Sequence, residues 1–204
     1  RSVVHELLLR FGARLLGAQS AQARVLVPLC GKTLDLAFFA ERCNAPVVGV
    51  EFVESAVEAF FAEHDLAATR TLHPTGGWPV YRGGDVELHA GNIFDVLPHL
   101  GRFDAIYDRA ALVALAPEPR RRYAGLLREA LAPGGRMLLS TTDYDQNEMT
   151  GPPYAVSLQE VSRHYETLQV ELLEDMDIFD AQGRFAKRGL TWQRGATHLI
   201  TRAT

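Results

Sequence analysis

The chain has 204 residues, of which 47% are hydrophobic and 23% are charged, and its net charge is −4 with an isoelectric point of about 6.0. This length suits a single domain over residues 1–204, and the acidic balance argues against a nucleic-acid partner. No apolar run approaches the roughly 20 residues that a membrane span requires. The only cysteines, Cys30 and Cys43, indicate neither a disulfide framework nor a metal site, so we expect no metal and a cytoplasmic location.

The first half of the chain alternates short apolar runs with helical patterns. The opening RSVVHELLLRFGARLL predicts an amphipathic helix rather than a signal sequence. Strands are predicted at Val25–Pro28 and 46–51, and helices at 34–40 and 55–63. Such a βαβα unit packs most economically as a parallel sheet with helices on its faces.

The second half continues the alternation after a glycine- and proline-rich stretch at 68–84, which predicts a loop or a hairpin insertion. Five further strands are predicted, and helices are predicted at 118–131, closed by PGG, and at 158–165, after a polar loop at 143–154. The five strands are 86–89, 103–108, 137–140, 168–174 and 196–201.

Together these elements predict an α/β fold: a doubly wound, mostly parallel seven-stranded sheet with helices on both faces. In this class, small molecules bind beyond the carboxyl ends of the strands, where the strand order reverses. We therefore expect the residues that follow the predicted strands to meet in one cleft, namely 29–31, 51, 91–95 and 108–109.

Residues 28–33, PLCGKT, end like a phosphate-binding loop. That loop requires a glycine five positions before Gly31, but Leu26 stands there, and no further glycine follows as a dinucleotide site requires. A single glycine suits a cofactor without phosphates, such as S-adenosylmethionine, which lies across the loop. Lys32 and Thr33 are then expected to begin the next helix.

Acidic and amide side chains follow the second and third strands. Glu51 stands twenty residues after the glycine, where a carboxylate binds ribose hydroxyls in Rossmann-like sites; the alternative is a solvated strand end. Residues 91–95, GNIFD, are placed to cover adenine, with Ile93 or Phe94 against the ring. The alternative there is a plain turn with Asp95 as a helix cap.

Four stretches, in this order, resemble the thiopurine S-methyltransferase family: VLVPLCGKTLDLAFFAER, VVGVEFVESAVEAFF, FDAIYDRAALVAL and YDQNEMTGPPYAV. The resemblance extends from about residue 7 to residue 200, and PLCGK, YDRAAL and GPPY are specific in combination. It implies a Rossmann-like class I methyltransferase fold, with S-adenosylmethionine as cofactor and S-adenosylhomocysteine as product. The implied methyl acceptor is the sulfur of a small thiol or thio-heterocycle, and some bacterial relatives are associated with selenium and tellurium compounds.

Carried over residue by residue, the resemblance implies two groups of site residues. Those that would hold the cofactor are Leu29, Gly31, Glu51, Asn92, Ile93, Phe94 and Arg109. Those that would border or act on the acceptor are Arg109, Asp145, Pro152, Pro153 and Arg184.

A mechanism follows from the chemistry of thiols. A thiol is already partly ionised near neutral pH, so we expect Arg109 and Arg184 to stabilise the thiolate, with Asp145 as the candidate for proton removal. The alternatives are an ion pair with Asp104 or Asp108 for the first arginine and a solvated loop charge for the second. Cys30 is expected to line the loop rather than to act as a nucleophile.

One departure from the family leaves the acceptor open. Members usually carry an N-terminal segment with tryptophans that closes over the site, whereas no tryptophan precedes Trp78 here, so we expect that lid segment to be missing from this chain. The alternative acceptors are nitrogen, oxygen, selenium or tellurium centres on a small metabolite, and a further alternative is a cofactor-binding protein without catalysis. We expect a monomer that acts on a small molecule, with neither nucleic acid nor membrane as partner.

Overall fold

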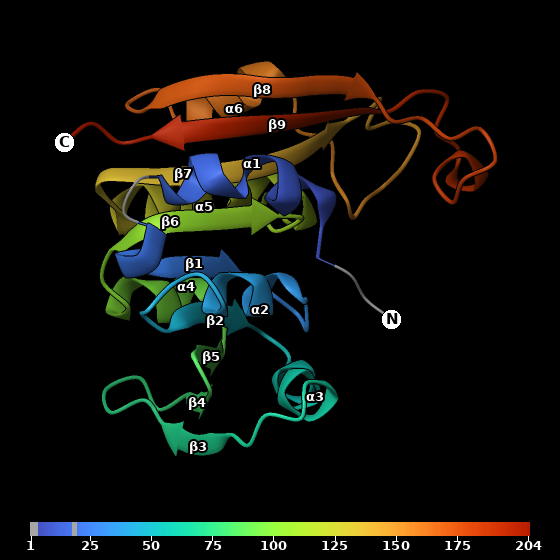
Figure 1. The fold of residues 1–204 in the computed structure, drawn as a ribbon. Helices are drawn as coiled ribbons and strands as arrows, with labels where there is room; N and C mark the ends of the chain where they lie inside the picture. The colour runs from blue at the N-terminus through green and yellow to red at the C-terminus, as the bar shows by residue number, and fades with distance from the viewer. Residues whose placement is uncertain (1–3, 18–19) are drawn as a thin grey trace.

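The computed structural model describes residues 4–17 and 20–204, which form an α/β fold with one central sheet (Figure 1). The strands are β1 (Val25–Pro28), β2 (Val47–Glu51), β3 (Thr69–Leu72), β4 (Pro79–Gly83), β5 (Val86–Ala90), β6 (Phe103–Arg109), β7 (Leu131–Asp143), β8 (Gln169–Asp177) and β9 (Arg194–Thr201). The α-helices are α1 (Glu6–Leu16), α2 (Asp35–Ala40), α3 (Glu54–Glu63), α4 (Ile93–Val96), α5 (Pro117–Ala130) and α6 (Leu158–His164). Short 3-10 helices are η1 (Ser20–Gln22), η2 (Leu97–His99), η3 (Leu112–Ala114) and η4 (Ala186–Arg188).

The sheet has nine strands within the described residues, in the order β3-β4-β5-β2-β1-β6-β7-β9-β8. The five strands from β5 to β7 are parallel, and antiparallel pairs extend the sheet at both ends. The predicted mostly parallel sheet with helices on both faces is confirmed, but seven strands were too few. The two additional strands, β3 and β4, form the hairpin within 68–84. Because β3 is exposed along its whole length, no burial pattern marks it in the sequence.

Helices cover both faces of this sheet, and each face carries its own hydrophobic core. In Figure 1, α1, α2 and α3 lie in front of the sheet and α4 and α5 behind it. All four residues of β1 are buried, as expected for a central parallel strand that is covered on both sides. The front core includes Val25, Phe39, Phe60 and Leu88, and the rear core includes Leu26, Ile106, Tyr123 and Leu127.

Two element boundaries differ from the predictions. Lys32 and Thr33 lie in the turn before α2, which begins at Asp35, because Gly31 has a positive φ of 53° and delays the helix. Strand β7 begins at Leu131, directly after α5, and the PGG stretch forms an irregularity within it. Gly134 has a φ of 72° there, and the register with β6 shifts at this point.

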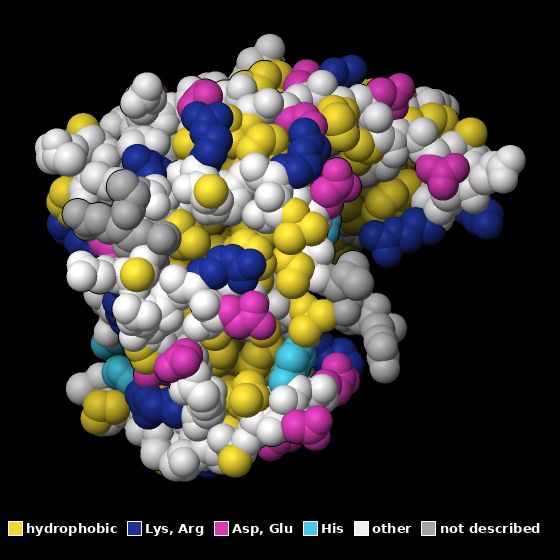
Figure 2. Space-filling model, viewed as in Figure 1, with side chains coloured by type: hydrophobic (Ala, Val, Ile, Leu, Met, Phe, Trp, Pro, Cys, Tyr) yellow, Lys and Arg dark blue, Asp and Glu magenta, His cyan; other side chains and the backbone are white. Residues whose placement is uncertain are grey.

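Figure 2 shows a surface on which acidic and basic side chains are interspersed. Ion pairs join α1 to the edge strand β8, where Arg10 meets Glu174 and Arg14 meets Glu171. None of the helices that the structure describes is long and apolar enough to cross a membrane.

Two loops form a lobe, which we define as residues 143–157 and 178–193. In Figure 1 the lobe extends past the arrowheads of the parallel strands, at the carboxyl edge of the sheet. Its own small core contains Tyr144, Met149 and Leu190. The two loops are also tied by hydrogen bonds, since Glu148 accepts from the backbone nitrogen of Thr191 at 2.9 Å and from its hydroxyl at 2.6 Å.

Candidate active site

A cavity of about 220 Å³ lies at the carboxyl ends of β1, β2 and β5. It is lined by Leu29, Val50, Phe52, Gly91, Asn92, Ile93, Phe94 and Leu115. Four of the residues predicted to hold a cofactor therefore meet in one place. Complete ligand pockets typically measure roughly 300–1,000 Å³, so this cavity suits one part of a larger ligand. A larger hollow of about 550 Å³ lies at the opposite edge of the sheet, where its lining contains none of the predicted site residues.

Glu51, the last residue of β2, connects the ends of two neighbouring strands. Its Oε2 accepts a hydrogen bond from the backbone nitrogen of Gly31 at 2.9 Å, and its Oε1 accepts one from Val53 at 2.9 Å. The half-buried carboxylate is thus held in place rather than merely solvated. A carboxylate has about four lone-pair sites, so two such bonds leave acceptor capacity for a pair of hydroxyl groups.

The backbone of the loop after β1 is unusual at two positions. Leu29 has a φ of 45°, a conformation that is costly for a residue other than glycine and that is often found at functional sites. Gly31 has a φ of 53°, and a Cβ added there would meet no described atom within 4 Å. An open space therefore lies above this glycine.

The side chains around the loop test which cofactor fits. The ammonium group of Lys32 pairs with the carboxylate of Glu63 on α3. It therefore binds this carboxylate rather than the phosphate that a phosphate-binding loop would hold. The open glycine, the fixed acid and the apolar cavity beside them fit an adenosine with an amino-acid tail. These residues match the phosphate-free cofactor predicted from PLCGKT.

Asn92 begins the short helix α4 at the end of β5. Its Oδ1 accepts from the backbone nitrogen of Phe94 at 3.1 Å, so the helix cap is Asn92, and the alternative of a cap at Asp95 is wrong. Asn92 is exposed, Ile93 is buried and Phe94 is half-buried, with the Arg122 guanidinium 4.8 Å from the Phe94 ring centre. An amide edge and apolar surfaces therefore lie side by side at this cavity.

Arg109 ends β6 and forms an ion pair with a residue that the sequence did not single out. Its Nε donates to Oδ2 of Asp35 at 3.2 Å. The predicted alternatives, Asp104 and Asp108, are wrong as partners of this arginine. Asp108 accepts from two backbone nitrogens and from the hydroxyl of Tyr123 instead. Successive side chains of a strand point to opposite faces, which places Arg109 and Asp108 on different sides of the sheet.

The lobe carries the residues predicted to border the acceptor. The carbonyl oxygen of Pro152 accepts from Arg188 at 3.1 Å, and that of Pro153 accepts from Tyr144 at 2.5 Å. Arg184 is exposed, with its guanidinium 4.5 Å from the ring centre of Phe185. The two prolines are thus tied to other residues of the lobe, whereas the contact of Arg184 is with its own neighbour in the chain.

Asp145 lies in the same lobe, where it is exposed. Its Oδ1 accepts from the backbone and the side-chain nitrogens of Asn147, at 3.0 and 2.9 Å. Within the described residues, neither Asp145 nor Arg184 forms a hydrogen bond or an ion pair with Arg109. The structure therefore brings Leu29, Asn92, Ile93 and Phe94 together, while Asp145 is held within its own turn.

Burial controls the ionisation of two groups near the cleft. Burial raises the pKa of the Cys30 thiol well above its ordinary range, which disfavours the thiolate and agrees with an apolar lining role. Burial also raises the pKa of Asp108 to about 6, although its hydrogen bonds oppose this shift. Within residues 4–17 and 20–204, no group of three or more His, Cys, Asp or Glu side chains could hold a metal ion.

Sequence reasoning missed three residues at this edge of the sheet. Phe52 is 72% exposed at the mouth of the cavity, and Leu115 lines it from the η3 turn. Phe52 could have been found from the sequence, because it is a large apolar residue directly after Glu51. Asp35 gave no signal of its own, because its partner Arg109 is 74 residues away in the chain.

Comparison with known proteins gives the family. The family model "Thiopurine S-methyltransferase (TPMT)" matches residues 1–203. A thiopurine S-methyltransferase of Pseudomonas aeruginosa is 45% identical over 184 residues, which are 89% of this chain and 83% of that protein. One of Pseudomonas paraeruginosa is 42% identical over 201 residues, covering 98% of this chain and 90% of that protein.

Solved structures give the fold. A Burkholderia thailandensis 1,6-didemethyltoxoflavin-N1-methyltransferase with bound S-adenosylhomocysteine has a TM-score of 0.62 at 18% identity, over 98% of this chain and 79% of that chain. The N-methyltransferase NodS of Bradyrhizobium japonicum, also in complex with S-adenosylhomocysteine, has a TM-score of 0.64 at 14% identity, over 96% and 85%. The chain therefore belongs to the thiopurine S-methyltransferase family and has the fold of the class I S-adenosylmethionine-dependent methyltransferases.

Proposed function

We propose that this protein transfers the methyl group of S-adenosylmethionine to the sulfur of a small thiol or thio-heterocycle. The observation that carries the proposal is the convergence of the apolar cavity, the open glycine and the fixed acid at one edge of the sheet. Family membership supports the same reaction. We further propose a monomer located in the cytoplasm, with sedimentation as the test of the former and fractionation of the native host's cells as the test of the latter.

The cofactor residues would divide the ligand among them. Glu51 would accept from the ribose hydroxyls with the lone pairs that its two backbone bonds leave. Leu29 and Gly31 would lie under the amino-acid tail, where a Cβ is absent and space is open. Asn92 would meet the edge of the adenine, with Ile93 and Phe94 against its face, as the lining of the cavity supports.

The chemistry of the transfer requires alignment above all. When bound, the cofactor supplies a methyl group on a positively charged sulfur, whose neutral thioether leaves as the acceptor attacks in line. Holding the acceptor at near-attack distance supplies much of the rate for such a displacement. A guanidinium beside a thiol lowers the pKa of the thiol and so increases the thiolate fraction. Arg109, at the carboxyl end of β6, is our candidate for this role.

The acceptor would lie between Arg109 and the lobe. Pro152, Pro153 and Arg184 belong to the lobe, and their assignment as acceptor contacts rests on the family resemblance. Proton removal by Asp145 stays a prediction, since the contacts of its carboxylate within its own turn do not add support to it. A thiolate acceptor does not require a general base.

A radiolabelled methyl-transfer screen over thiols, selenols, amines and phenols tests the proposed reaction. We expect label on thiols. Label only on the other acceptors would show that sulfur is the wrong acceptor, and cofactor binding without any transfer would support a non-catalytic protein.

Arg109→Ala tests the role of the arginine in that reaction. We expect slower transfer to thiols with the fold preserved, as checked by circular dichroism. Arg121→Ala is the matched control, because Arg121 is an exposed arginine on α5. Unchanged turnover of Arg109→Ala at saturating substrates would remove Arg109 from the mechanism.

A further inference from the structure

A buried carboxylate stands between the start of the chain and the candidate catalytic arginine. Asp35 is the first residue of α2 and is 1% exposed. Its Oδ1 accepts from the backbone nitrogen of His5 at 2.8 Å, and its Oδ2 accepts from Nε of Arg109 at 3.2 Å. An ionised carboxylate in such a place is costly unless it is paired and hydrogen-bonded, and these two bonds supply the pairing.

The way in which this carboxylate binds Arg109 matters for the guanidinium. Arg109 offers five N–H donors in a rigid plane, and the contact with Asp35 uses only the one on Nε. The two terminal nitrogens form no hydrogen bond with any residue that the structure describes. The Arg109 side chain is 34% exposed, so part of the guanidinium group remains open to a ligand while its orientation is fixed.

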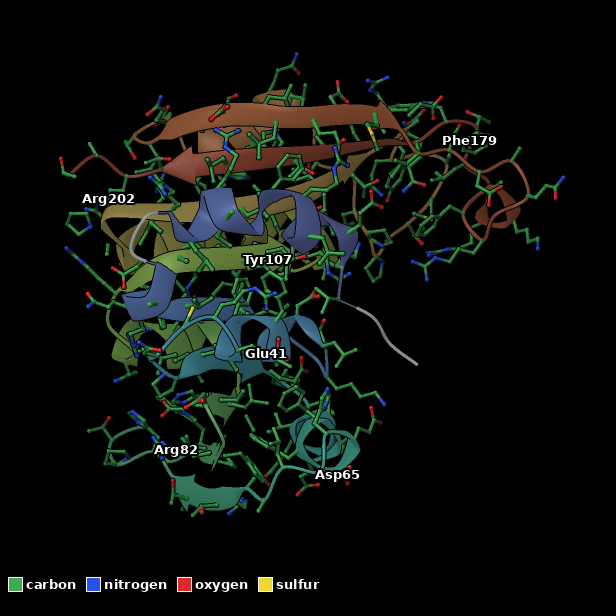
Figure 3. All side chains as sticks on the ribbon, viewed as in Figure 1. Glu41, Asp65, Arg82, Tyr107, Phe179 and Arg202 are labelled. Atoms are coloured by element: carbon green, nitrogen blue, oxygen red, sulfur yellow. The ribbon has the colours of Figure 1, made fainter. Side chains whose placement is uncertain are left out.

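The remaining polar groups around this pair are neutral. Tyr107, on the same face of β6, has a buried hydroxyl without a hydrogen-bond partner in the described structure. Figure 3 shows Tyr107 between α1 and α2. Burial raises the pKa of Tyr107 well above its ordinary range, and burial together with the charge of Arg109 lowers the pKa of His5. Asp35 is therefore the one anion that the described residues place against Arg109.

We propose that Asp35 is a positioning residue, which holds the Arg109 guanidinium so that its two terminal nitrogens face the acceptor thiolate. The inference rests on the proposed function of Arg109. By this inference the short segment from Gly31 to Asp35 serves both substrates. Gly31 would contact the cofactor, and Asp35 would orient Arg109 toward the acceptor. A displacement in which donor and acceptor must be aligned gains from such a shared element.

A double-mutant cycle tests the proposal, using wild type, Asp35→Asn, Arg109→Ala and the double variant. Asparagine has the size of aspartate but lacks the charge and one of its two acceptor oxygens. We expect Asp35→Asn to lower kcat/KM for a small aromatic thiol by about 10-fold to about 10²-fold, as a misplaced catalytic group does. Cofactor affinity, measured by calorimetry with S-adenosylhomocysteine, should stay the same. The double variant should be no slower than Arg109→Ala alone.

The pH profile separates positioning from a merely structural role. If Arg109 faces the thiolate, the rising limb of kcat against pH should move to higher pH in Asp35→Asn, because kcat follows the ionisation of the bound acceptor, which then ionises less readily. Glu160→Gln is the matched control: Glu160 pairs with the buried Arg120 on the far side of the sheet, so its loss should lower stability but leave the profile in place.

The outcomes distinguish this inference from the proposed function. If Asp35→Asn does not fold, Asp35→Glu keeps the charge but extends it by one methylene, and it should raise KM for the thiol without changing cofactor affinity. Losses that multiply in the double variant, or an unchanged kcat/KM in a folded Asp35 variant while Arg109→Ala is impaired, would overturn the positioning role alone. Full turnover by Arg109→Ala would instead overturn the function proposed for Arg109, and the positioning role with it.

Discussion

The proposed cofactor side of the cleft, at the ends of β1, β2 and β5, and the lobe are built in different ways. The cofactor side lies on the carboxyl ends of buried parallel strands, and the acid of β2 holds the loop after β1 through backbone hydrogen bonds. The lobe consists of two loops at the antiparallel end of the sheet, held by a small core and by side-chain contacts such as that between Glu148 and Thr191. Side chains in loops change more freely than backbone contacts at strand ends. We therefore expect substitutions to be tolerated less well on the proposed donor side than in the lobe, where acceptor choice can vary.

The largest expected effect is a loss of folding stability at low pH, which arises at the antiparallel end of the sheet, where the lobe is attached. His198, in the middle of β9, is 2% exposed, and burial lowers its pKa from 6.5 to about 4. Between these pH values the unfolded chain binds the proton and the native chain does not, so stability is lost as pH falls from about 6.5 to about 4. The loss amounts to at most about 3 kcal/mol.

Chemical denaturation of wild type and His198→Leu at several pH values checks this. The difference between the two proteins isolates His198, because the opposite trend expected from the raised pKa of Asp108 is common to both. A difference that stays constant from pH 7 to pH 4 would contradict the expectation.

The next effect concerns the donor side alone. Glu51→Ala should weaken the binding of S-adenosylhomocysteine by about 1–3 kcal/mol, because charged hydrogen bonds to the ribose would be lost. Calorimetry measures this directly. Glu63→Ala is the control, since it removes a neighbouring acid that pairs with Lys32. Equal affinities of Glu51→Ala and wild type would refute the ribose assignment. A changed KM for the thiol at saturating cofactor would show that the cofactor side and the acceptor side are not independent.

A smaller effect is expected on the acceptor side. Arg184→Ala should raise KM for a thiol about fivefold, or about 1 kcal/mol, because an exposed charge contributes little in water. Steady-state kinetics with saturating cofactor measures this, and the affinity for S-adenosylhomocysteine should not change. Arg163→Ala, which removes an exposed arginine from α6, is the control. A weaker cofactor affinity in the Arg184 variant would show that the lobe also serves the donor.

The smallest effect separates two roles of Asn92. Serine keeps an oxygen that can cap α4, whereas alanine does not, so Asn92→Ala should lose about 1 kcal/mol of stability and Asn92→Ser much less. If the amide also contacts adenine, both variants should lose about 0.5–1 kcal/mol of cofactor affinity. Thermal unfolding and calorimetry give the two quantities. Full affinity in Asn92→Ser would leave Asn92 with the cap as its only role.

The shared position of the proposed donor residues could be predicted from the sequence because these residues are close together in the chain. Gly31 and Glu51 belong to one strand–helix–strand unit, so their spacing alone placed them at the same edge of the sheet. The cavity then brought Asn92 and its neighbours to the same edge, as expected for the next parallel strand.

The acceptor side depends on contacts between distant segments, which spacing does not reveal. Pro152 and Arg188, which are 36 positions apart, meet because β7 and β9 are antiparallel neighbours. The bond from Arg109 to Asp35 spans 74 residues, and the alternation of side chains along β6 decides which acid the arginine can reach. Periodicity predicted the strands β6, β7 and β9 but not these partners.

The hydrogen bonds between Glu148 and Thr191 have a consequence for engineering. A graft that replaces residues 143–157 alone would leave the threonine without its acceptor, and a graft of 178–193 alone would leave the glutamate without its donors. The two segments therefore form one structural unit, although α6 and β8 separate them in the chain. Redesign of acceptor preference should exchange both loops together while leaving the ends of β1, β2 and β5 untouched.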